Sequence, residues 1–248
     1  ANVTNFEKLE VASGGTLSLT DNMLAVGDGS AGTGVFVQSG GTLFGGMGTT
    51  TLSAPVTIGG TLSAPVGSTI SVSGDTTFEA GSRFQVGIAS DADAGLLKGD
   101  GGEVSFASGS EVYADVTQGA ELGEGGTRVA TATGGITDNG LTVDDNSIIY
   151  KFTHELRNAG ADLFLIAKRA LTAVQTTVNG RIGTNAESIA SAIDVYLDTA
   201  PTDNVIATYL AQFPVGEQEA QLLQLVKDSL PAESGGEGAA TIAATDLV

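Results

Sequence analysis

The chain has 248 residues and no cysteine, and its 29 acidic and 10 basic residues give a formal net charge of −19. The absence of cysteine excludes disulfides and thiolate metal sites, and so acidic a surface repels phosphate backbones, which counts against nucleic acid as a partner. Thirty-six glycines against five prolines favour many tight turns over a collagen-like or proline-rich chain. The sequence contains no run of 18 apolar residues, so no membrane-spanning helix is predicted.

A turn motif recurs through the first half of the chain. A glycine pair between two short alternating apolar runs occupies residues 11–19, 37–43 and 56–62, and looser copies occupy residues 66–72, 78–86 and 106–112. Glycine accepts a positive φ without steric cost, so each pair predicts a sharp turn. Repeats of this kind bury their apolar faces only by stacking on one another, which predicts a solenoid of about seven turns over residues 1–170.

The residues that flank the turns alternate with the period of a β-strand. Apolar side chains such as Leu17, Leu19, Ile70 and Val72 are expected to point inward. The polar side chains between them are expected to point outward: Thr16, Ser18, Thr20, Thr69, Ser71 and Ser73. Pro55 and Pro65 are predicted at strand ends, where no ladder hydrogen bond is lost. We assign residues 1–95 to this stem.

Residues 96–170 are predicted to close the stem. Glycines continue to separate the predicted strands there, and we interpret four of them as turn glycines: Gly99, Gly101, Gly134 and Gly135. Residues 138–140 predict a primed hairpin turn between residues 130–133 and 141–143. Residues 147–153 and 162–167 predict a second strand pair around residues 158–160.

Four segments in a fixed order carry a family resemblance: residues 97–106, 109–116, 128–136 and 161–169. They resemble the pertactin-like autochaperone region of bacterial type V autotransporter passengers. The resemblance implies a mainly β fold, a right-handed parallel β-helix with a β-sandwich-like C-terminal cap and a small α-helical segment after it. It also implies a cap that folds first outside the cell, with a core that we assign to Val104, Phe106, Val112, Val129, Ile136, Tyr150, Phe152, Leu163 and Leu165.

The composition changes after residue 169, where apolar residues take helical spacing. Residues 184–187 predict a capping box, and further helices are predicted over residues 203–212 and 217–230. The apolar stripes are expected to comprise Val205, Ile206, Tyr209, Leu210 and Phe213, and then Leu222, Leu223, Val226 and Leu230. Residues 171–233 form either a helical appendage without a ligand or, as the resemblance implies, a linker. Residues 234–248 are then a flexible segment towards an outer-membrane barrel of the same precursor.

Few residues suggest catalysis or metal binding. His154 is the only histidine and has no nucleophile motif of the Gly-x-Ser-x-Gly type, so we interpret it as a surface or cap residue. Asp91, Asp93, Asp144 and Asp145 offer carboxylates to calcium, but turn formation is the simpler explanation for them. We predict no catalytic residue, cofactor or metal site.

The chain is therefore expected to be the structural stem and folding seed of a secreted or surface-displayed passenger, exported across a bacterial outer membrane. The start of the sequence lacks a signal peptide, and we expect a piece of a longer precursor. One alternative is an adhesin or self-association module, whose Ser- and Thr-rich faces at residues 16–20, 49–53 and 68–73 bind a host ligand or a second copy. The other is a polysaccharide-active enzyme with paired carboxylates.

Overall fold

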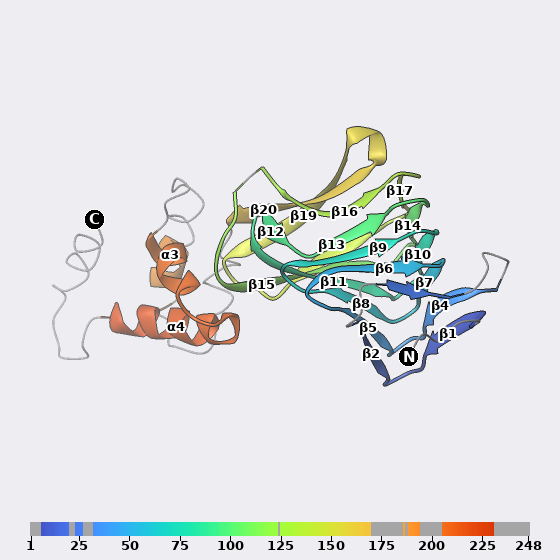
Figure 1. Ribbon diagram of the computed structural model, residues 1–248. Helices are drawn as coiled ribbons and strands as arrows, with labels where there is room; N and C mark the ends of the chain where they lie inside the picture. The colour runs from blue at the N-terminus through green and yellow to red at the C-terminus, as the bar shows by residue number, and fades with distance from the viewer. Residues whose placement is uncertain are drawn as a thin grey trace, which may run out of the picture. The chain divides into compact units, whose positions relative to one another are not determined.

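About half of the described residues form strands in three sheets, and a few helices follow them in the chain (Figure 1). The computed structural model describes residues 6–19, 23–26, 32–123, 125–169, 186, 188–193 and 205–230. Contacts divide the chain into a larger unit, Ala1–Ser147 with Phe152–Lys168, and a smaller unit, Ile148–Lys151 with Arg169–Val248.

The chain visits the three sheets in turn, and each such pass adds one strand to each sheet. The first sheet contains β1 (Lys8–Val11), β4 (Gly34–Val37), β7 (Val56–Ile58), β10 (Thr76–Phe78), β14 (Val104–Phe106) and β17 (Ile136–Asp138), in that order and all parallel. The fold is therefore mainly β with parallel sheets, as the sequence predicts. The first sheet holds six strands, against the seven turns expected.

The other two sheets repeat this order. The second contains β2 (Thr16–Leu19), β5 (Thr42–Gly45), β8 (Thr61–Ala64), β11 (Arg83–Ser90), β15 (Glu111–Glu121) and β18 (Thr142–Asp145), with β12 (Asp93–Ala94) antiparallel to β11. The third contains β3 (Met23–Ala25), β6 (Gly48–Ser53), β9 (Ser68–Val72), β13 (Leu96–Gly99), β16 (Thr127–Ala132), β20 (Asp162–Arg169) and β19 (Tyr150–Arg157).

Apolar side chains form the core because the strands are in register. In the first sheet the register aligns five buried residues into one column: Val11, Val37, Ile58, Phe78 and Phe106. In the second sheet Leu43, Leu62, Phe84 and Val112 form another column, and each is 0% exposed. Alternation within a strand sends every second side chain inward, and the register stacks those side chains from pass to pass.

The recurring turn motif lies at one corner of the fold, between the first and second sheets. The glycines Gly14, Gly40, Gly81, Gly109 and Gly140 all occupy it with a φ between +75° and +108°. The turns bond to one another, since the Gly14 N–H donates to the Gly40 carbonyl at 2.9 Å and the Gly81 N–H to that of Gly109 at 3.0 Å. The copy at residues 66–72 is an exception, because it lies between β8 and β9, at a different corner.

Two local predictions are wrong. Residues 138–140 do not join a hairpin, because β17 pairs with β14 in the first sheet whereas β18 pairs with β15 in the second. Among the described residues, positive φ outside glycine occurs only at Asn158 and Ala159, so Asn139 lacks the conformation of a primed turn. Ser71, expected outward and exposed, is 3% exposed and donates a hydrogen bond to the Asp100 carboxylate.

The second predicted strand pair is confirmed. β19 and β20 are neighbours in the third sheet, joined by the 3₁₀ turn η1 (Asn158–Gly160), and β20 pairs with β16 in the antiparallel direction. Residues 96–145 extend the same three sheets without a break at residue 95. The passes become longer along the chain: Val56 pairs with Thr76, 20 residues on, whereas Val104 pairs with Ile136, 32 residues on.

Helices make up the described part of the smaller unit after residue 169. Residues 188–193 are helical, and α3 (Val205–Ala211) and α4 (Val215–Asp228) confirm the helices predicted over 203–212 and 217–230. The α3 stripe is only half right, because Ile206 and Leu210 are buried whereas Val205 and Tyr209 are 57% and 39% exposed. The capping box at 184–187 and the linker at 234–248 lie outside the described residues, except for residue 186. No helix in the described part of the chain is long and apolar enough to cross a membrane.

One buried hydroxyl predicts a stabilising substitution. Thr76 is 0% exposed and pairs in register with Val56 and Val104, and its Oγ1 has no hydrogen-bond partner among the described residues. Thr76→Val removes that unsatisfied group at nearly constant volume, so we expect the free energy of unfolding to rise by about 1 kcal/mol in urea denaturation. Thr77→Val, on the exposed face of the same strand, is the control and should change it by less than about 0.5 kcal/mol. A loss of stability in Thr76→Val would contradict this reading of the site.

Candidate functional site

The nine residues assigned to the folding core are all buried, each at most 8% exposed. They come from six strands: Val104 and Phe106 from β14, Val112 from β15, Val129 from β16, Ile136 from β17, Tyr150 and Phe152 from β19, and Leu163 and Leu165 from β20. Eight of them belong to the larger unit, and Tyr150 belongs to the smaller one. The candidate site is therefore the interior of the last two passes with the β19–β20 hairpin.

Aromatic rings connect this interior to the preceding pass, which contains β10 and β11. The rings of Phe78 and Phe106 stack with centroids 4.6 Å apart and planes 9° apart, and Phe84 lies 5.8 Å from Phe78 in a tilted arrangement. Phe78 and Phe84 are 0% exposed but are missing from the assigned core. Their position could have revealed them, since they flank the turn at residues 79–82 as Phe106 and Val112 flank the turn at 107–110.

The hairpin attaches to the parallel sheets through β16. Leu163 pairs with Ala130 and Leu165 with Thr127, and both leucines are 0% exposed. The register shifts between Arg128 and Ala130, which is where the buried Val129 lies. The hairpin thus covers the end of the third sheet with apolar side chains on its inner face.

A buried carboxylate holds the start of β20. Asp162 is 5% exposed, accepts a hydrogen bond from Asn158, and has an oxygen 3.9 Å from the Arg128 Nη1. Burial alone would raise the pKa of Asp162, but hydrogen bonds from Thr131 and Asn158 and the charge of Arg128 outweigh it and hold the pKa below its usual value. The ionised carboxylate therefore fastens the turn of the hairpin to β16.

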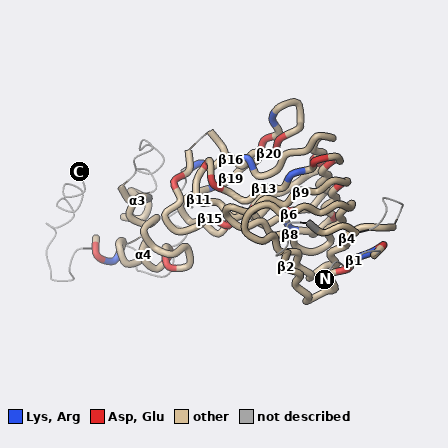
Figure 2. The backbone as a smooth tube through the Cα atoms, in the orientation of Figure 1, with Lys and Arg blue, Asp and Glu red and all other residues tan. Residues whose placement is uncertain are grey.

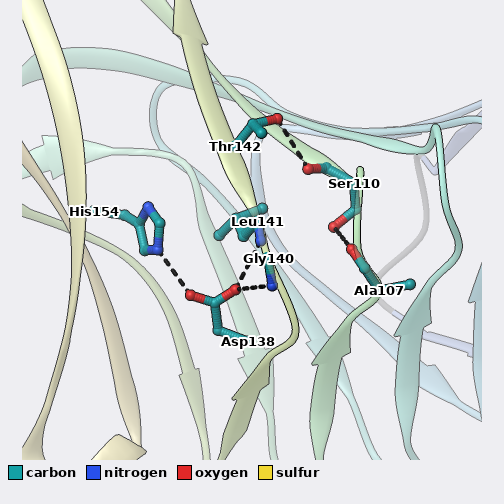
Figure 3. A network of polar contacts seen from close by, with 7 residues as sticks. All are labelled: Ala107, Ser110, Asp138, Gly140, Leu141, Thr142 and His154. Carbon is teal, nitrogen blue, oxygen red and sulfur yellow. Dashed lines mark hydrogen bonds and ion pairs between the residues drawn. The ribbon is translucent and has the colours of Figure 1, made fainter.

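A second carboxylate joins the last corner to β19 (Figure 3). Asp138 accepts hydrogen bonds at Oδ1 from the N–H groups of Gly140 (2.9 Å) and Leu141 (2.7 Å), and its Oδ2 lies 2.8 Å from the His154 Nε2. In the preceding turn, the Ser110 hydroxyl donates to the Ala107 carbonyl at 2.7 Å. Asp138 thus stabilises its own turn and links it to the hairpin.

Comparison with protein-family models, curated proteins and solved structures finds no match to this chain.

The turn glycines serve two different purposes. Gly135 has a φ of +93°, as a turn glycine should. Gly99 is instead the last residue of β13, which makes its assignment as a turn glycine wrong. Gly101 and Gly134 have no positive φ and are needed for space, since a Cβ would lie 2.5 Å from the Ser73 oxygen and 2.7 Å from the Gly102 oxygen. Close approach of backbones from successive passes explains these two glycines.

Three of the four acidic residues considered for calcium lie in strands: Asp93 begins β12, and Asp144 and Asp145 end β18. Asp91 accepts a hydrogen bond from the Gly123 N–H at 2.9 Å, and the Asp93 N–H donates to the Ser90 hydroxyl at 3.1 Å. Asp144 accepts from the N–H of its neighbour Asp145 at 2.9 Å. Within the described residues no group of three or more His, Asp or Glu side chains could hold a metal ion.

The Asp138 network predicts a pH-dependent loss of stability. Burial raises the pKa of Asp138, but the N–H donors of Leu141 and Gly140, together with His154, lower it further, so its pKa lies below the usual value near 3.8. A lowered carboxyl pKa stabilises the folded state above that usual value, and the stability is lost as the pH falls through the lowered pKa. We expect Asp138→Asn to cost about 1 kcal/mol at pH 7, and this cost to shrink as the pH falls below 3.8 and through the lowered pKa, measured by urea denaturation at a series of pH values. A cost that stays the same over that range would contradict this role of the charge.

Proposed function

We propose that the chain is the membrane-proximal stem and folding seed of a secreted or surface-displayed type V autotransporter passenger. In this proposal the three parallel sheets form a right-handed β-helix, and the β19–β20 hairpin with the last two passes forms its closing cap. Its partner is an outer-membrane barrel of the same precursor, and its location is the bacterial surface or the medium. The recurrence of the strand order through three sheets supports the β-helix.

The hairpin is the observation that carries the proposal. Parallel strands of successive passes pair across 20 to 32 residues of chain. Closing a loop of that length lowers the conformational entropy of the chain before any stabilising contact has formed. β19 and β20 meet across the three-residue turn Asn158–Gly160 and so form at low cost. Once formed, β20 offers an edge and two buried leucines to β16. Each earlier pass could then add to an existing edge.

Surface display tests this proposal. The chain is placed between a reporter and an outer-membrane translocator barrel, and surface reporter is quantified in live cells by antibody binding. Leu163→Ala removes a fully buried contact of the hairpin, and Leu43→Ala removes one of the same type in β5. We expect Leu163→Ala to lower display several-fold and Leu43→Ala to leave most of it. Equal display from the two variants would contradict a seed at the hairpin.

A further inference from the structure

The middle of the larger unit carries no charge. Residues 32–74 contain no Asp, Glu, Lys, Arg or His, although the whole chain has a net charge of −19. This segment forms β4 to β9, so it contributes two adjacent strands to each of the three sheets. In Figure 2 the tube is accordingly tan through β4 and β6 to β8, and the acidic and basic residues lie before and after them. We call this the uncharged band.

Two large apolar side chains are exposed within the uncharged band. Phe44 in β5 is 38% exposed, and Met47, between β5 and β6, is 78% exposed. Phe44 lies between two serines on the outward face of the second sheet. The register places the exposed Ser18 and the buried Ser63, which is 6% exposed, beside it on the neighbouring strands. Two residues earlier, Thr42 aligns with Thr16 and Thr61 on the same face.

We propose that this outward face around Phe44 binds a neutral, hydroxyl-rich polysaccharide. A sugar ring presents an apolar C–H face, which packs on an aromatic ring, and hydroxyl groups at its rim, which exchange hydrogen bonds with serine and threonine. The face offers both kinds of contact and extends over parallel strands that are about 4.8 Å apart. A chain of sugars can therefore contact several strands in succession.

The charge distribution selects this occupant over two others. On the same face of the second sheet, Arg83 of β11 aligns with Thr61 and is ion-paired with Glu111 of β15. Asp115 of β15 and Asp144 of β18 lie further along this face, so its acidic groups outnumber its basic ones. A second copy of this chain would add its own negative charge, and an acidic polysaccharide would be repelled in the same way. A neutral polysaccharide carries no such cost.

Binding to defined glycans tests the proposal with the full chain. The probes are maltoheptaose, cellohexaose, laminarihexaose and mannohexaose, titrated by calorimetry, with polygalacturonate as the acidic counterpart. We expect one or more neutral probes to bind and polygalacturonate not to bind. Phe44→Ala should weaken that binding about tenfold, the loss expected of one aromatic contact. Thr42→Ala should weaken it by a smaller factor.

Phe36→Ala is the matched control. Phe36 is a partly exposed aromatic of β4 in the first sheet, with the Lys8 Nζ 4.7 Å from its ring centroid, and its loss should leave glycan affinity unchanged. Circular dichroism and sedimentation check that each variant keeps the fold and the oligomeric state of the unsubstituted chain. No binding of any neutral probe, stronger binding of polygalacturonate, unchanged affinity in Phe44→Ala, or dimerisation through the Phe44 face would each overturn the proposal. The folding-seed proposal is independent, since glycan titration uses folded protein.

Discussion

Replacing Phe106 by alanine is expected to lower the free energy of unfolding by about 3–5 kcal/mol. Phe106 is 0% exposed, and its ring stacks on that of Phe78 with centroids 4.6 Å apart. The substitution removes the buried apolar surface of one ring, leaves a cavity between two passes, and deprives Phe78 of its stacking partner. Urea denaturation followed by circular dichroism measures the loss.

Phe36→Ala is the control for this measurement, because it removes the same side chain from a partly exposed position. We expect it to cost about 1 kcal/mol or less. If Phe106→Ala cost no more than Phe36→Ala, the stacked rings would not be the centre of the core, and the account of the candidate site would be wrong.

Leu163→Ala is expected to cost about 2–5 kcal/mol and to slow folding by most of the corresponding factor. Leu163 is 0% exposed in β20 and pairs with Ala130 of β16. It therefore belongs to the contact between the hairpin and β16, which forms first in the proposed order of folding. A substitution inside the part that forms early reduces the folding rate, whereas one elsewhere mainly raises the unfolding rate. Stopped-flow refolding and unfolding over a range of urea concentrations separates the two effects.

Leu43→Ala provides the comparison in the same experiment. Leu43 is also 0% exposed, but it lies in β5, in the second pass. We expect a similar loss of stability that appears almost entirely as faster unfolding. If Leu43→Ala slowed folding as much as Leu163→Ala, folding would not begin at the hairpin.

The sequence predicted the strands and turns because their signals are local. A glycine pair between alternating apolar runs is a short pattern. At residues 11–19 and 37–43 it correctly predicted the sharp turns that connect the first sheet to the second. The helices α3 and α4 were recognisable from apolar spacing and the prolines that follow them. The nine core residues were recognisable as apolar, inward-phase positions, and all are buried.

The sequence failed where the answer depends on which strands become neighbours. Residues 138–140 have the composition of a hairpin turn, yet β17 and β18 each find a parallel partner from the preceding pass. Residues 96–170 were predicted to close the stem, although the parallel pairing continues through residues 96–145 with larger intervals between paired residues. The roles of Gly101 and Gly134 and the link between Asp138 and His154 also depend on contacts between distant residues.

Pulse-labelled hydrogen exchange during refolding tests the central claim most directly. The chain is diluted from urea, labelled for milliseconds at successive times, and digested for mass spectrometry, which gives the order in which amides become protected. We predict that amides of β16, β19 and β20 become protected first, and that those of β4 to β6 follow. Earlier protection of β4 to β6, or simultaneous protection of all strands, would contradict a folding seed at the hairpin.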